Sequence, residues 1–205
     1  MAKKKLIIIV PGVKPLSQWP RLIARTCHSL IRLLSLRPVY EDHAKIWKGK
    51  INDGKSNVLW FSWNRNPDVL SKLWAVKKLQ RLINSKSEKI KLVGISIGGE
   101  IILEAIKGKH YKNISKAILV CSINETRKIG EKKIKIVNIY SSSDGFAEAA
   151  IETLSFFNGS RRLAGKNIIN INLPKMDHVN FCANSIILRG KYKGERPSDV
   201  VNEFL

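Results

Sequence analysis

Six short apolar runs, most of them rich in Ile and Val, constrain the fold of this chain more than any other feature. They are Leu6–Val10, Val58–Trp63, Ile90–Ile95, Ala117–Cys121, Ile134–Tyr140 and Ile168–Leu173. Several of these runs are nearly continuous, which is typical of strands that are buried on both faces of a parallel sheet.

Segments with apolar residues at three- and four-residue steps lie between these runs and predict helices. They are Arg21–Leu36, Pro67–Ile83, Gly99–Lys107, Phe146–Phe157 and Val179–Leu188. Strands that alternate with helices form right-handed crossovers, which place helices on both faces of a parallel sheet. We therefore predict one domain over residues 1–205, of the α/β class: a three-layer α/β/α sandwich around a mostly parallel sheet of about six strands. Residues 38–57 are predicted to form a loop or a short hairpin, and residues 197–204 a last helix.

A G-x-S-x-G-G motif centred on Ser96 follows the third apolar run directly and opens the third helical segment. A serine at such a sharp strand-to-helix turn has strained backbone geometry, and glycines on either side remove side chains that would collide there. This context predicts that Ser96 is a nucleophile. The alternative is a tight turn without chemistry.

Two later strands end on the residue types that would complete a catalytic triad. Asp144 follows the fifth run and His178 follows the sixth, and the carboxyl ends of parallel strands share one edge of the sheet. Asp177 is a rival for the acid, although it is the chain neighbour of His178. The alternatives are that Asp144 caps a helix starting near Phe146 and that His178 is a surface histidine. The other histidines are interpreted as structural: His28, His43 and His110.

With Ser, Asp and His in this order, the chain resembles the α/β-hydrolases, and in layout the small lipases and esterases that lack a lid. The resemblance covers Leu6 to about Leu188. It implies the spatial strand order 2-1-3-4-5-6, and an oxyanion hole formed by the backbone N–H groups of Ile97 and Val13. Only about a dozen residues separate the fourth and fifth runs, where larger relatives insert a lid, so no cap domain is expected.

These residue types support acyl transfer to water. An imidazole takes the proton of the serine hydroxyl, the carboxylate holds the imidazole in the correct tautomer, and the N–H groups stabilise the oxyanion. We therefore predict a serine hydrolase that cleaves a carboxylic ester or thioester, with no cofactor and no metal. The alternative is a catalytically silent scaffold that binds anionic lipid or a protein.

Aromatic residues after the second run are candidates for a substrate pocket. Trp60 and Trp63, together with Phe61 and Trp74, would form one wall of an acyl pocket, and the alternative is that they belong to the core. Glu100 is interpreted as a first-turn helix residue that the helix dipole favours, rather than as a catalytic acid.

The charge of the chain is unusual: 37 Lys and Arg against 16 Asp and Glu give a net charge of +21. Such a charge creates a positive potential over much of a surface. Besides a small acyl ester or lipid substrate, an anionic membrane surface is therefore a candidate partner, and so is non-specific contact with nucleic acid, for which no motif is present. The alternative is compositional bias. The oligomeric state is left open.

The N-terminus imitates a secretory signal but does not match one. Its apolar run ends after five residues at Pro11, which is too short for a signal peptide, and no run approaches the roughly 18 residues of a membrane span. We therefore expect a cytoplasmic protein. The three cysteines, Cys27, Cys121 and Cys182, are widely spaced and are expected to be reduced thiols without a metal.

Overall fold

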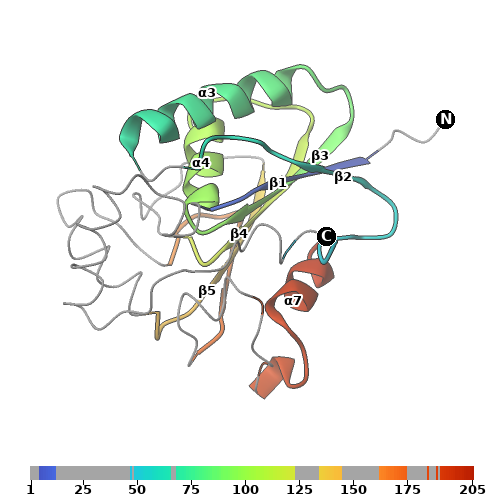
Figure 1. The fold of residues 1–205 in the computed structure, drawn as a ribbon. Coiled ribbons are helices and arrows are strands. Elements are labelled where there is room, and N and C mark those ends of the chain that lie inside the picture. The colour runs from blue at the N-terminus through green and yellow to red at the C-terminus, as the bar shows by residue number, and fades with distance from the viewer. Residues whose placement is uncertain are drawn as a thin grey trace.

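The computed structural model is built around a sheet of six parallel strands in the order β2-β1-β3-β4-β5-β6 (Figure 1). The strands are β1 (Lys5–Val10), β2 (Asn57–Trp60), β3 (Lys89–Ile95), β4 (Ile114–Val120), β5 (Lys135–Tyr140) and β6 (Ile168–Asn172). All five pairings are parallel. The predicted six-stranded sheet is confirmed, in the order that the resemblance implies.

The structure describes residues 5–12, 47, 49–65, 68–122, 134–144, 162–174, 184, 188 and 190–205. Three predicted helices, 21–36, 146–157 and 179–188, lie wholly or mostly outside this part of the chain, as does the connection 123–133. The same is true of Val13, Asp177 and His178.

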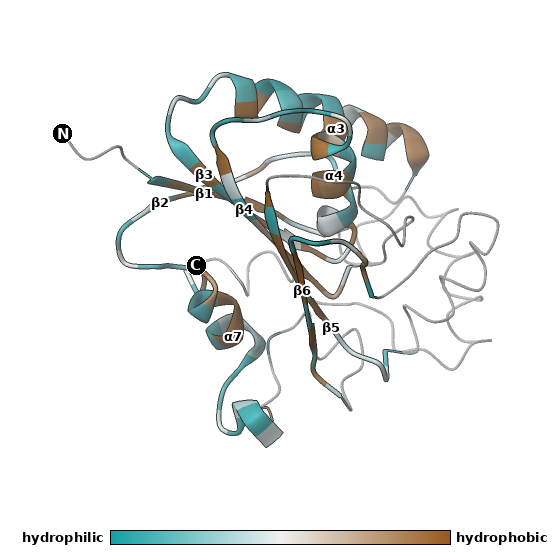
Figure 2. Ribbon diagram, turned by 180° about the vertical axis from the view of Figure 1, so that it is seen from behind, coloured by the Kyte–Doolittle hydropathy of each residue, from teal (hydrophilic) through white to brown (hydrophobic). Residues whose placement is uncertain are grey.

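The central strands are apolar on both faces because each face packs against its own hydrophobic cluster. In β1, Leu6, Ile8 and Val10 belong to one cluster, whereas Ile7 and Ile9 belong to the other. Successive side chains of a strand point to opposite faces of the sheet. When both faces are covered, all of these side chains are buried, and the strand is apolar along its whole length. The brown strands of Figure 2 show this pattern.

Helices α3 (Val69–Asn84) and α4 (Ile97–Ile106) cover one face of the sheet. Helix α7 (Pro197–Glu203) and the short 3-10 helix η3 (Gly190–Tyr192) lie on the other face (Figure 1). The Asp68 carboxylate caps α3 by accepting a hydrogen bond from the Ser71 N–H at 2.7 Å, and a second from the Ser71 hydroxyl lowers the pKa of that carboxyl. Helices on both faces confirm the α/β architecture.

Element boundaries differ from the sequence-based expectations by a few residues. Strand β2 ends at Trp60, before the predicted Trp63, although the Phe61 N–H still donates to the Ile9 carbonyl at 2.8 Å. Helix α4 begins at Ile97, two residues before the predicted Gly99, because the turn at Ser96 leads directly into it. The predicted last helix is α7. No helix in the described ranges is long and apolar enough to cross a bilayer.

Candidate active site at the end of the third strand

Ser96 occupies the turn between β3 and α4 in a backbone conformation that side-chain-bearing residues rarely adopt, with φ 55° and ψ −129°. Two hydrogen bonds hold this conformation: the Ser96 N–H donates to the Val120 carbonyl at 2.8 Å, and its carbonyl accepts from the Gly99 N–H at 2.9 Å. Serine at a helix N-terminus usually caps it with its hydroxyl, but within the described structure the Ser96 side chain does not cap α4. The turn therefore presents a serine hydroxyl that the helix does not use as a cap.

The glycines of the motif are required by close contacts rather than by their own torsion angles. A Cβ on Gly94 would lie 2.5 Å from Cα of Gly99, and one on Gly98 would lie 2.1 Å from the Val10 carbonyl oxygen. A Cβ on Gly99 would lie 1.7 Å from the Ser122 hydroxyl. The first turn of α4 thus packs directly on the ends of β1, β3 and β4, which fixes the position of Ser96.

The loop that leaves β1 lies against Ser96. A Cβ on Gly12 would be 3.1 Å from Cβ of Ser96 and 3.7 Å from its hydroxyl oxygen. The Trp63 indole donates to the Pro11 carbonyl at 3.1 Å, and the Arg65 guanidinium donates through Nε to the Gly12 carbonyl at 2.8 Å. Neither role could be predicted from the sequence, because each contact joins positions more than fifty residues apart.

One of the two oxyanion donors that the resemblance implies is described. Ile97 is the first residue of α4, and the N–H groups of a first helical turn have no partner inside the helix and lie at its positive end. Such an N–H beside the serine is suited to an oxyanion. Val13, the second implied donor, lies outside the described residues, although Gly12 before it is held by Arg65.

Asp144 lies four residues beyond the end of β5 and is 1% exposed. The thiol of Cys121, at the end of the neighbouring strand β4, donates a hydrogen bond to Oδ2 of this carboxylate at 3.0 Å. A buried carboxylate is costly unless donors surround it. Cys121 was expected only to be a reduced thiol, which it is, and its contact with Asp144 is new.

The loop that carries Asp144 is joined to the end of β6, the strand that leads toward His178. The Ser142 N–H donates to Oδ1 of Asn172 at 3.0 Å, and the Asn172 amide donates to the Ser142 hydroxyl at 3.1 Å. The described chain continues to Pro174, four residues before His178. The acid candidate and the segment leading to the base candidate therefore leave adjacent strands at one edge.

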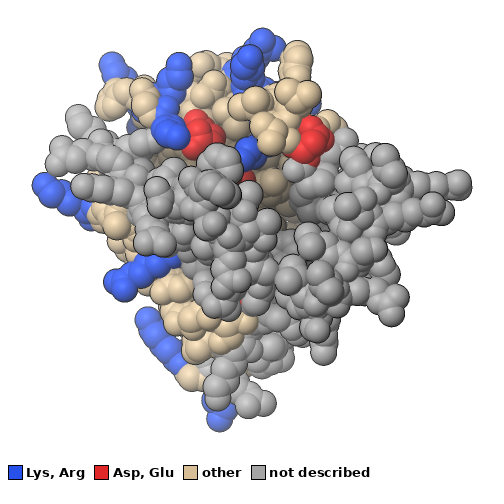
Figure 3. All heavy atoms as spheres, turned by 90° about the vertical axis from the view of Figure 1, so that its left-hand side faces the viewer, with Lys and Arg blue, Asp and Glu red and all other residues tan. Residues whose placement is uncertain are grey.

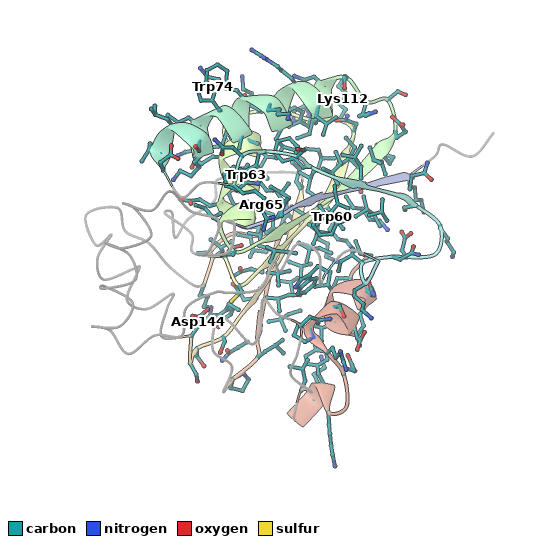
Figure 4. The ribbon with its side chains drawn as sticks, in the orientation of Figure 1. Trp60, Trp63, Arg65, Trp74, Lys112 and Asp144 are labelled. Atoms are coloured by element: carbon teal, nitrogen blue, oxygen red, sulfur yellow. The ribbon has the colours of Figure 1, made fainter. Side chains whose placement is uncertain are left out.

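The tryptophans proposed for a pocket do not form one wall. Trp63 packs against the cluster on the α3 side of the sheet and Trp60 against the cluster on the opposite side. Phe61 is buried in the core, whereas Trp74 is 70% exposed and points away from the body of the molecule (Figure 4). The Trp63 indole hydrogen-bonds the loop beside Ser96.

Glu100 and His110, which were also singled out in the sequence, both lie in the described part of the chain. Glu100 lies in the first turn of α4, is 7% exposed and pairs with Lys72 of α3 at 2.9 Å. His110 follows the C-terminal end of α4, at the edge of the sheet opposite to Ser96. His28 and His43 are outside the described residues.

No group of three or more potential metal ligands occurs among the described residues. A groove of about 550 Å³ lies along β6, between that strand and the η3–α7 segment, and its lining does not include Ser96 or Asp144. The described part of the site therefore consists of a serine turn, a buried acid and backbone N–H groups.

The fold is similar to those of several solved structures. A protein designated a YdeN-like hydrolase from Pectobacterium atrosepticum has a TM-score of 0.54 and 12% identity, over 98% of this chain and 90% of its own. A protein from Agrobacterium vitis, also designated a hydrolase, has a TM-score of 0.54 and 11% identity, over 98% of this chain and 86% of its own. The protein Atu2452 from Agrobacterium tumefaciens, of unknown function, has a TM-score of 0.51 and 13% identity, over 100% and 91%.

No protein-family model and no curated protein matches the sequence. At identities of 11–13% the structural likeness concerns the fold and not the chemistry. It extends over nearly the whole chain and agrees with the strand order and with the serine turn after β3. The chain therefore has the α/β-hydrolase fold.

Proposed function

We propose that this protein is a serine hydrolase that cleaves a carboxylic ester or thioester through an acyl-enzyme. The observation that carries the proposal is the backbone of Ser96, held at φ 55° between β3 and α4 although serine is disfavoured there. Strain of this kind persists only where the surrounding structure fixes it, and it gathers at functional sites. The burial of Asp144 at the same edge of the sheet supports it.

The proposed reaction has two half-reactions. The Ser96 Oγ attacks the carbonyl carbon while His178 takes its proton, and the N–H groups of Ile97 and Val13 stabilise the oxyanion. The leaving alcohol or thiol receives that proton from His178, and the acyl group stays on Ser96. Water then attacks the acyl-enzyme and gives a proton to His178. As the bond between the acyl carbon and Ser96 Oγ breaks, His178 returns this proton to Oγ, so that the acid and free Ser96 are released.

Asp144 orients the imidazole in this proposal, and the described contacts suit it for that role. The Cys121 thiol donates to Oδ2 and thereby helps to fix the orientation of the carboxylate at the carboxyl edge of the sheet. Trp63 is the better pocket candidate of the two proposed tryptophans, since it borders the loop beside Ser96.

A fluorophosphonate probe tests the proposal, because it reacts only with an activated serine. We expect labelling of the intact protein, mapped to the peptide that contains Ser96, and hydrolysis of p-nitrophenyl acetate that rises with pH as the base becomes neutral. Ser96→Ala should abolish both while the melting temperature stays within a few degrees. Ser87→Ala, at an exposed serine after α3, is the matched control and should retain both.

Two results would contradict the proposal. Wild-type protein that is neither labelled nor active on p-nitrophenyl esters of increasing chain length would indicate the alternative, a catalytically silent scaffold. Labelling that persists in Ser96→Ala would assign the nucleophile to another residue.

A further inference from the structure

The outward face of α3 exposes an unusual concentration of large apolar side chains. Val69 is 65% exposed, Leu70 69%, Leu73 50% and Trp74 70%. In the described part of the chain, these are four of the six exposed large hydrophobic residues. Figure 4 shows Trp74 pointing away from the protein, and Figure 2 shows brown where α3 begins.

Within the described part of the chain, α3 packs on the fold through the side opposite to this face. Its buried residues recur at every fourth position and contact the sheet and α4: Ser71, Ala75, Leu79 and Ile83. The exposed apolar side chains of α3 therefore contribute nothing to this packing. A contiguous exposed apolar surface of this kind is typical of an interaction site.

Cationic residues continue the same outward face toward the C-terminal end of α3. Lys77, Lys78 and Arg81 are exposed, and α3 contains no acidic residue. Lys78 donates to the Ser62 carbonyl at 2.6 Å and lies 5.9 Å from the Phe61 ring. Lys77 and Arg81 are therefore the two cations assigned to the outward face. Figure 3 shows Lys and Arg side chains along this side of the molecule.

The apolar half of α3 lies at the edge of the sheet that carries Ser96. Helix α3 follows the carboxyl end of β2 and runs back toward the start of β3, so its first two turns are at the carboxyl edge. Ser96 follows the carboxyl end of β3, at that edge.

We propose that the outward face of α3, from Val69 to Arg81, docks the protein on an anionic lipid bilayer. Leu70, Leu73 and Trp74 would enter the boundary between headgroups and acyl chains, a position that suits the amphipathic indole, while Lys77 and Arg81 contact anionic headgroups. A second copy of this chain is a poor occupant, because each copy has a net charge of +21 and the two would repel. The inference goes beyond the proposed function and does not depend on it.

Co-sedimentation with vesicles, after nuclease treatment of the protein, tests the docking surface. We expect binding to vesicles of phosphatidylcholine with 30% phosphatidylserine, at about 50 mM salt, and binding at least about tenfold weaker to pure phosphatidylcholine. The triple variant Leu70→Gln, Leu73→Gln and Trp74→Gln should lose at least about tenfold in affinity, since glutamine keeps helix propensity but not apolar area. The control is Val58→Thr with Ile169→Thr, at the two exposed apolar positions outside α3.

The contribution of charge is tested separately, with two double variants that each lose two positive charges at different places. Lys77→Gln with Arg81→Gln should weaken binding about thirtyfold, because each basic residue at the membrane contributes about fivefold. Lys191→Gln with Lys193→Gln, at the η3 segment on the opposite face of the sheet, should weaken it much less.

Trp74 reports its own insertion. Vesicles should shift the fluorescence of the wild type to shorter wavelength, and Trp74→Phe should bind with similar affinity but show a much smaller shift. The proposal is overturned if the wild type does not bind anionic vesicles, if the triple variant or the Lys77 and Arg81 variant binds like its control, or if the shift persists without Trp74.

Two other results would assign the outward face of α3 to a different partner. Self-association without lipid binding, abolished in the triple variant, would assign this face to a second copy of the chain. Binding to an acidic protein but not to lipid would assign it to a protein of that class.

Discussion

At the scale of single residues, the contact between Cys121 and Asp144 is the least expected feature of the site. Both side chains are nearly completely buried, at 2% and 1% exposure, and the thiol lies 3.0 Å from Oδ2. A hydrogen bond to a charged acceptor favours the charged form of that acceptor and fixes its orientation. Cys121 is therefore expected to act as a positioning residue for the acid.

Cys121→Ala should lower kcat for p-nitrophenyl acetate about tenfold with little change in KM, because the carboxylate loses a donor worth about 1.5 kcal/mol. Cys121→Ser keeps an O–H donor and should recover most of kcat. Equal kcat in wild type and Cys121→Ala, or no recovery with serine, would show that the thiol only fills space.

At the scale of elements, the first turn of α4 can pack closely against the end of β1 because glycines stand at the contact. Gly98 meets the backbone of Val10, which belongs to a central strand and cannot move away. A Cβ on Gly12 would lie 3.1 Å from Cβ of Ser96 and 3.1 Å from the Ile95 carbonyl oxygen, where a shift of a few tenths of an ångström is enough to accommodate it. The two glycines therefore have different consequences when replaced.

Gly98→Ala should destabilise the fold by about 3 kcal/mol or more, because a methyl group 2.1 Å from a carbonyl oxygen forces the helix off the sheet. Gly12→Ala should cost about 1 kcal/mol or less but lower kcat severalfold by crowding the Ser96 side chain. Urea unfolding and p-nitrophenyl acetate hydrolysis of the two variants measure both effects. If Gly12→Ala is the less stable of the two, the packing described for α4 is wrong.

At the scale of the whole molecule, hydrogen bonds and an ion pair connect the segment before β2 with strand β3 and with the C-terminal segment that contains α7. The Asp53 carboxylate pairs with Lys91 of β3 at 2.7 Å, and Lys91 also donates to the carbonyl of Leu205. The Asn202 amide of α7 donates to the Lys50 carbonyl at 2.8 Å. Partial burial raises the pKa of Asp53, but the hydrogen bonds from Lys91, Lys55 and Ser56 outweigh burial and hold it well below its ordinary value.

Because the pKa of Asp53 is lower in the folded protein, its contribution to stability is present above the unfolded value of about 3.9 and is lost as pH falls through the folded value. Asp53→Asn should therefore reduce the free energy of unfolding by about 1 kcal/mol at pH 7. The difference from wild type should shrink as pH falls below about 4.

Urea unfolding at pH 7, 5 and 3 measures this difference. Glu104→Gln, which breaks the more exposed pair with Lys107, is the control and should change stability less at pH 7. A difference that grows on acidification would contradict the assignment of the pair.

The amino-acid sequence alone determined the features that depend on neighbours along the chain. Ile and Val runs such as Leu6–Val10 specified strands buried on both faces, and the glycines around Ser96 specified the sharp turn, because propensity, periodicity and backbone sterics act over a few residues. The alternation of these strands with helical segments then indicated a parallel sheet.

Only the tertiary structure decided which distant residues meet. Cys121 contacts Asp144, Arg65 holds Gly12, and Trp60 and Trp63 lie on opposite sides of the sheet although three residues separate them. In α3 the same apolar residue types are buried at Leu79 and exposed at Leu70. The hydropathy of a side chain indicates whether burial is favourable, but it does not determine which residues lie beside it. Those neighbours depend on how separate elements pack together.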